Sequence, residues 1–259
     1  MPSITKYTKS TIIAALKEIR SRGWIKSLRN TRNDGAIGNT LEDLLGITEN
    51  NLPLPNAAEW ELKTQRKNTT ALLTLFHLEP SPRALHIADY LLENFGWPHK
   101  QAGIKYPDSE KSFRQTLSYR APTRRGFFVD IDTENQRVTV RFDLSGVSDE
   151  LSDWKDNLPE YDEDYVPYWG FSDLYHKAGV KLGNCFYVLA DVKEECGEYF
   201  YNYSDIMQLQ GFSLEKFLCC IREGNILIDF DARTGHNHGT KFRIRPDAIP
   251  SLYEHVKHI

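Results

Sequence analysis

The sequence predicts a mixed α+β fold with a central sheet, best treated as one domain with lobes. Three observations lead to this prediction. Segments with helical apolar spacing are interspersed with strand-like runs; 259 residues with 40% hydrophobic content suffice for one large domain; and no internal repeat or low-complexity linker divides the chain. The longest apolar runs cover only a few residues, whereas a membrane helix needs about 20. We therefore expect no membrane span.

The N-terminal part predicts two amphipathic helices. The first covers Ser10 to Arg22, where Ile12, Leu16 and Ile19 recur at helical spacing before Gly23. The second follows a polar, glycine-bearing stretch. Its apolar residues share one face and are Ile37, Leu41, Leu44 and Leu45. Glu42 lies beside that face.

Two strand-like runs, 59–64 and 71–78, are joined by the basic polar link 65–69, and we predict that they form an antiparallel pair. Phe127 to Ile131 and Val138 to Phe142 alternate apolar and polar residues around Thr133 to Gln136, which predicts a hairpin. The other elements expected are a helix near 171–178, a strand at 185–190, a helix at 213–223 and a strand at 225–231.

Cysteine usage and the N-terminus bear on the compartment. The four cysteines form no CxxC pair. The adjacent Cys219 and Cys220 are expected to pack as apolar residues on a helix and not to form part of a disulfide framework. The first residues lack the apolar core of a secretory signal. We expect a cytoplasmic, reducing location.

The net charge of −4 conceals an uneven distribution. Eight acidic residues and one lysine lie between Asp149 and Asp164, and the rest of the chain carries 31 basic residues against 28 acidic ones. A mildly basic body permits a surface that faces phosphates. The acidic segment itself is more typical of a solvated surface loop.

The sharpest chemical signal is Glu61-Leu62-Lys63. In a strand, residues two apart share a face, so Glu61 and Lys63 project together while Trp60 and Leu62 point into the body. If Glu61 and a second acid hold a divalent metal, Lys63 is placed to orient a water and to stabilise charge at a phosphodiester. Taken alone, the pattern is more typical of a surface ion pair.

Several spaced motifs, in one order along most of the chain, resemble the MvaI and BcnI family of restriction endonucleases, with MutH a more distant relative. They are Asp34 to Gly46, Glu49 to Leu52, Pro55-Asn56, Glu61 to Lys63, Leu72 to His77, Tyr168 to Phe171 and Gly235 to Ile244. The resemblance implies a PD-(D/E)xK nuclease core, with a central mixed sheet flanked by helices and a DNA-recognition lobe. A catalytic lobe is expected on 1–110, and recognition elements in 111–165 and 225–250.

By family position, Glu42 is a catalytic glutamate on a helix, Glu61 the metal-binding acid and Lys63 the catalytic lysine. The sequence departs from the family at Asn56, where the family has an aspartate that binds magnesium. Asparagine offers a hard cation one neutral carbonyl oxygen. The site is therefore inactivated, lost or rerouted; Glu59, which shares a strand face with Glu61, is one alternative ligand.

The late segment is dense in side chains that can read base edges. The residues expected to bind DNA are His77, Arg233, His236, Asn237, His238, Lys241 and Arg243. Alternatives remain open: a zinc site at His236 and His238, a solvated sheet face carrying Arg243 and Arg245, and a buried structural role for His77. Further candidates for phosphate contacts, or for a flexible basic loop, are Arg114, Arg120, Arg124 and Arg125.

The resemblance implies a prokaryotic type II endonuclease that cleaves double-stranded DNA with Mg²⁺ and leaves 5′-phosphates. It also implies a five-base-pair target of the CC-N-GG type, a monomer that nicks the strands in turn, and a cognate DNA methyltransferase. Two other functions stay open: sequence-specific DNA binding without cleavage, because of Asn56, and mismatch-directed nicking of the MutH type.

Overall fold

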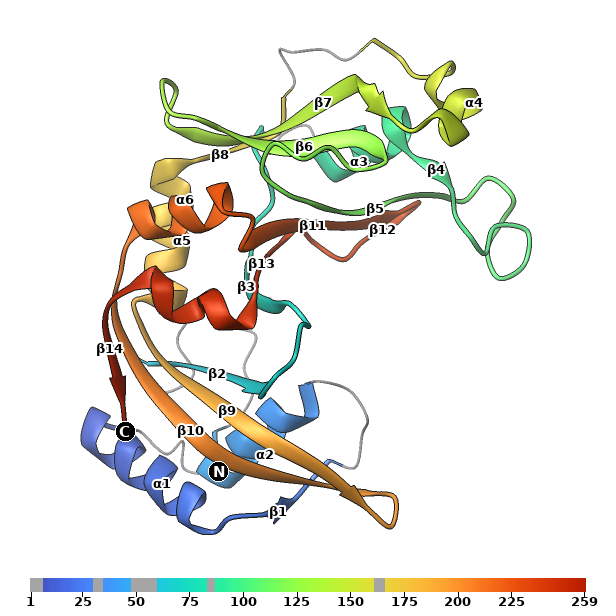
Figure 1. Ribbon diagram of the computed structural model, residues 1–259. Coiled ribbons are helices and arrows are strands. Elements are labelled where there is room, and N and C mark those ends of the chain that lie inside the picture. The colour runs from blue at the N-terminus through green and yellow to red at the C-terminus, as the bar shows by residue number, and fades with distance from the viewer. Residues whose placement is uncertain (1–6, 30–34, 48–59, 83–86, 161–165) are drawn as a thin grey trace. The chain divides into compact units, whose positions relative to one another are not determined.

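The structure is a computed structural model that describes residues 7–29, 35–47, 60–82, 87–160 and 166–259 (Figure 1). The chain forms two compact units, each assembled from separated segments. Unit 1 contains residues 1–73, 178–216 and 245–259, and unit 2 contains residues 74–177 and 217–244. The catalytic lobe expected on 1–110 thus falls into two parts, because residues 74–110 belong to unit 2.

Two helices of unit 1 follow the predicted apolar spacing. Helix α1 (Lys9–Ser21) begins with a capping box, in which Thr8 and Thr11 exchange side-chain and backbone hydrogen bonds. It ends before Gly23, whose φ of +69° favours glycine. Helix α2 (Gly35–Leu45) packs against the strand that carries Glu61.

The sheet of unit 1 is mixed. Its order is β1 (Ile25–Lys26), β10 (Glu198–Phe212), β9 (Asn184–Glu195) and β2 (Glu61–Arg66), and β14 (Tyr253–His258) pairs with β10. Strand β2 runs parallel to β9, whereas the other pairs are antiparallel. In this register Glu61 faces Cys185 and Lys63 faces Tyr187.

One face of this sheet buries the core of unit 1. Apolar residues of α1 and α2 pack there with Trp60, which precedes β2, with Leu62 of β2 and with Phe186 and Val188 of β9. Cys185 and Tyr187 alternate with Phe186 and Val188, so they point to the opposite face. There the Tyr187 hydroxyl donates to the carbonyl of Pro246, in the 3₁₀ helix η4 (Pro246–Leu252).

Unit 2 contains two further sheets. The first has the order β3 (Leu73–His77), β13 (Lys241–Ile244), β11 (Ile226–Arg233), β5 (Lys111–Leu117) and β4 (Trp97–Pro98), with β12 (His236–Asn237) on β11. The second has the order β6 (Arg125–Asp132), β7 (Arg137–Val147) and β8 (Tyr168–Gly170). Buried aromatic rings join the two: Phe113 of β5 meets Phe127 of β6 edge-on at 5.2 Å.

The remaining elements are α3 (Ile87–Phe95), the 3₁₀ turn η2 (Asp149–Leu151), α4 (Ser152–Lys155), α5 (Phe171–Leu182) and α6 (Leu214–Arg222). The chain passes from one unit to the other within α5 and again within α6. None of the helices that can be described has the length and apolar character of a membrane span.

The cysteines are free and divide evenly by exposure. Cys185 and Cys220 are buried, whereas Cys196 and Cys219 are exposed. The prediction that both adjacent cysteines fill an apolar helix face is therefore wrong for Cys219.

The expected antiparallel pairing of the two early strands is also wrong. Strand β2 pairs with β9, and β3 is placed beside β13 in a different sheet. The parallel pairing with β9 buries Leu62 against α1 and α2, which a local hairpin with β3 would not do. The β6–β7 hairpin, by contrast, is confirmed.

Candidate catalytic and nucleic-acid-contacting sites

Glu61 and Lys63 lie together on the face of β2 that points away from α1 and α2. The Lys63 Nζ is 3.1 Å from the Glu61 Oε1, and both side chains are largely buried, with 16% and 6% of their surfaces exposed. The shared face predicted from the period of a strand is confirmed. The structure thus holds an ion pair in a low-dielectric setting, where each charge acts strongly on its surroundings.

The second carboxylate oxygen of Glu61 is a buried acceptor. Oε2 is shielded from solvent and receives no hydrogen bond in the structure. Such an atom is costly unless a donor or a cation satisfies it. Glu61 therefore fits the role of a metal ligand that binds a divalent cation through Oε2 while Oε1 holds Lys63.

Neutral groups surround this pair. Burial raises the pKa of the Cys185 thiol to about 12, and burial raises the pKa of the Tyr253 phenol above its ordinary value. The two side chains hydrogen-bond to each other beside Glu61 and Lys63. Burial thus keeps the thiol and the phenol beside the ion pair in their protonated, neutral forms.

The other predicted catalytic residues are placed differently. Glu42 lies on α2, half-buried, and α2 packs against β2, where Gly38 faces Thr64. Asn56 and Glu59 lie outside the described residues. Within the described ranges, no three His, Cys, Asp or Glu side chains gather closely enough to hold one metal ion.

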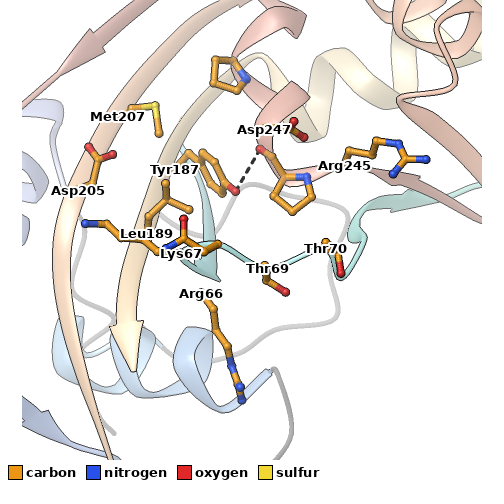
Figure 2. Close-up of a pocket in the computed structure, with 13 residues that line it drawn as sticks. Arg66, Lys67, Thr69, Thr70, Tyr187, Leu189, Asp205, Met207, Arg245 and Asp247 are labelled. Atoms are coloured by element: carbon orange, nitrogen blue, oxygen red, sulfur yellow. Dashed lines mark hydrogen bonds between the residues drawn. The ribbon is translucent and has the colours of Figure 1, made fainter. Parts of the chain in front are cut away.

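A pocket of about 660 Å³, which the sequence does not predict, continues along the same sheet face (Figure 2). Tyr187, the register partner of Lys63, forms one wall. The end of β2 and the link that follows it supply Arg66 to Thr70, Arg245 comes from the position just before η4, and Asp247 comes from η4 itself. The basic link 65–69, which the sequence predicts as the connection of a hairpin, is the part of the sequence that points to this pocket.

Arg245 was expected to alternate with Arg243 on a strand, and this is wrong. Strand β13 ends at Ile244, and Arg245 adopts the extended backbone that precedes η4. Pro246 fixes the backbone that starts η4, so the chain leaves the sheet at this point. Arg245 also belongs to unit 1, whereas Arg243 belongs to unit 2.

The predicted DNA-binding residues form two groups within unit 2. The first surrounds the turn between β12 and β13, where His236, Asn237 and His238 are exposed. The two histidine rings pack edge-on with centroids 4.2 Å apart, and the Asn237 Oδ1 accepts a hydrogen bond from the Gly239 N–H. His77 is exposed next to Gly239, so the alternative of a buried structural histidine is wrong.

The second group consists of cations that face acids on the sheet. Lys241 lies 3.5 Å from Asp231, and Arg243 lies 3.4 Å from Asp229. These separations are at the upper limit of a hydrogen bond. Arg233 is held more tightly, at 2.9 Å from the buried Glu110.

The four further arginines have partners within unit 2. Arg114, Arg120 and Arg124 are exposed and pair with Asp231, Asp130 and Glu150. The Arg125 guanidinium lies over two tryptophan rings, 4.0 Å from the Trp97 centroid and 4.7 Å from the Trp154 centroid, and burial lowers its pKa. These two cation–π contacts indicate a structural role for Arg125.

Comparisons with known proteins agree on one family. Residues 13–253 match the MvaI/BcnI restriction endonuclease family. The chain is similar to the solved complex of restriction endonuclease MvaI with its cognate DNA substrate, with 24% sequence identity and a TM-score of 0.76 over 98% of this chain and 99% of that one. It is also similar to MvaI in the absence of DNA, with 23% identity and a TM-score of 0.56 over 100% of both chains. No curated protein sequence matches.

Proposed function

Because the chain belongs to the MvaI/BcnI restriction endonuclease family, we propose that it hydrolyses phosphodiester bonds of duplex DNA at a short specific site. The observation that carries this proposal is the buried ion pair of Glu61 and Lys63 on β2. A carboxylate with one unsatisfied oxygen beside an ammonium is the arrangement that phosphodiester hydrolysis needs at a metal-assisted site.

The proposed cofactor is Mg²⁺. Glu61 would hold it through Oε2, together with the residue at position 56. When bound, the ion supplies charge neutralisation at the phosphate and a lowered pKa for a bound water.

The chain's own residues carry out the remaining tasks. Lys63 stabilises the negative charge that develops on the phosphate oxygens, and Glu61 keeps the Lys63 ammonium in place. Water adds to the phosphorus while the bond to the 3′-oxygen breaks, which leaves a 5′-phosphate and a 3′-hydroxyl. Glu42, on the helix packed against β2, is proposed as a further catalytic residue of this site, as the family resemblance implies.

Base reading is assigned to the exposed turn and to the cations of the unit 2 sheet. Asn237, His236 and His238 are exposed, and Lys241 and Arg243 lie on the sheet of the same unit beside Asp231 and Asp229. Arginine and lysine recognise guanine, and asparagine recognises adenine, through the major groove. A target of the CC-N-GG type, rich in guanine, suits this set of donors.

A second candidate function is specific DNA binding without cleavage. Asn56, at the position of the family's metal-binding aspartate, favours it because a neutral amide is a weak ligand for Mg²⁺.

For the endonuclease, the proposed assembly is a monomer that nicks the two strands in turn. The proposed setting is a prokaryotic cytoplasm where a cognate methyltransferase protects the host DNA.

One experiment separates these functions. A plasmid library is incubated with the protein and Mg²⁺ or Mn²⁺, and the ends produced are sequenced. Breaks at one short sequence in both strands support the restriction endonuclease, and the sequences give the target. Specific binding without breaks favours the binding protein, and nicks confined to one strand favour the MutH type. Random breaks, or neither breaks nor binding, would overturn the proposal.

A further inference from the structure

The loop between β4 and β5, residues 99–110, is a fixed projection of unit 2 (Figure 1). The carbonyl of Gln101 accepts hydrogen bonds from the N–H groups of Ile104, Lys105 and Tyr106, at 3.0–3.2 Å. The His99 N–H donates to the backbone carbonyl of Glu110 at 2.8 Å, which joins the two ends of the loop. Gly103 adopts a φ of +73°, which favours glycine. The tip is therefore held in one conformation by its own backbone.

An aliphatic side chain stands at this tip. Ile104 is 85% exposed, more than any other large hydrophobic residue among those described. Lys100 precedes it by four residues and Lys105 follows it directly, and both are exposed, whereas the single exposed acid of the loop is Asp108. An exposed apolar side chain in a basic loop gains nothing from packing within the chain. It matches a duplex groove, where phosphates border apolar base and sugar edges.

The loop is joined to the segment assigned to base reading. The Arg233 guanidinium lies over the Tyr106 ring, 4.7 Å from its centroid, and also pairs with Glu110. The Lys111 N–H donates to the Thr234 hydroxyl at 3.0 Å, and the Thr234 N–H donates to the Lys111 carbonyl at 3.1 Å. The loop and residues 233–238 thus form one continuous surface within unit 2.

We propose that the loop of residues 99–110 is a second DNA-contacting element. Lys100 and Lys105 contact phosphates, and Ile104 packs into the adjoining groove of the duplex. This inference rests on the proposed function, because it requires DNA as the ligand. It assigns to Arg233 a positioning role, since its contacts with Tyr106 and Glu110 fix the loop beside the base-reading turn.

The two kinds of contact leave different signatures in binding. Each lysine that neutralises a phosphate contributes about 0.9 to the slope of log affinity against log salt concentration. Replacing both Lys100 and Lys105 by alanine is expected to reduce that slope by nearly twice this amount. Ile104→Ala is expected to weaken binding about tenfold without changing the slope, because only apolar contact is lost.

The test measures the anisotropy of a labelled target duplex in EDTA, which prevents cleavage, at several salt concentrations. Val256→Ala and Lys17→Ala are the matched controls, since Val256 is an exposed hydrophobic residue of β14 and Lys17 an exposed lysine of α1. Thermal melts establish that each variant is folded. Wild-type affinity and slope in all loop variants would overturn the loop inference while leaving the proposed function standing. Absence of binding by the wild-type protein would instead overturn the proposed function.

Discussion

At the scale of single residues, Glu61 is an acid whose two oxygens have different surroundings. Oε1 contacts the Lys63 ammonium, while Oε2 is buried without a donor. An alternation of two residues along a strand sufficed to predict the shared face of this pair. The neutral Cys185 and Tyr253 beside it were not predictable, because β9 and β14 lie more than a hundred residues away in the sequence.

Lys63→Ala is expected to reduce Mg²⁺-dependent cleavage by about a thousandfold, because the charge on the phosphate loses its stabilising ammonium. Specific DNA binding is expected to persist, since Lys63 is not assigned to base reading. Cleavage of one duplex and a gel shift on the same duplex measure the two effects. Lys26→Ala is the control, because Lys26 forms an exposed pair with Glu198 in the same unit. Equal loss of binding and cleavage in Lys63→Ala would contradict the assigned role.

Asn56→Asp is expected to raise Mg²⁺-dependent cleavage by at least about a hundredfold. A restored carboxylate supplies charge stabilisation at the metal, and about 1.4 kcal/mol corresponds to tenfold in rate. Single-turnover cleavage by both proteins measures the change. Equal, rapid rates would mean that another acid, such as Glu59, already serves the site. Slow cleavage by both would favour the binding function.

At the scale of elements, short-range patterns predicted structure well and long-range pairing did not emerge from them. The β6–β7 hairpin follows from two alternating runs around a short turn. The pairing of β2 with β9 depends on a strand that begins at Asn184. For the same reason the acidic partners of the predicted DNA-binding cations were not predictable. Only the register of β11 against β13, in which Asp229 is opposite Lys241, brings Asp231 near Lys241 and Asp229 near Arg243.

The turn of the β6–β7 hairpin gives a pH-dependent prediction. Hydrogen bonds from the backbone and side chain of Asn135 and from Arg137 lower the pKa of Asp132 from 3.8 to about 2. A lowered pKa stabilises the folded state above the unfolded value, and this stabilisation is lost as the pH falls from 3.8 through about 2. The free energy of unfolding is therefore expected to be larger for the wild-type protein than for Asp132→Asn at about pH 5. The difference is expected to vanish toward about pH 2.

Urea unfolding of both proteins across this range measures the difference. Glu134→Gln, at an exposed position of the same turn, is the control for removal of one negative charge. A difference between wild type and Asp132→Asn that stays constant with pH would contradict the assigned hydrogen bonds.

At the scale of the whole molecule, each unit is assembled from segments that are distant in the chain. The fragment of residues 1–110, which the sequence assigned to a catalytic lobe, contains β2 but neither β9 nor β10. Strand β2 would lose its only sheet partner among the described strands, and α1 and α2 would lose the β9 part of their core. We expect this fragment to be unfolded. Its far-ultraviolet circular dichroism signal, followed during heating, is expected to show no cooperative transition. A cooperative transition would show that the lobe is autonomous.

The distribution of the cysteines makes the chain suitable for spectroscopy without any mutation. Cys196, on the turn between β9 and β10 in unit 1, and Cys219, on α6 in unit 2, are exposed, while Cys185 and Cys220 are buried. Thiol reagents act on accessible thiolates, so they select the first two. A pair of spin labels or fluorophores attached there would place one reporter on each unit, and would measure the distance between the units in free and DNA-bound protein.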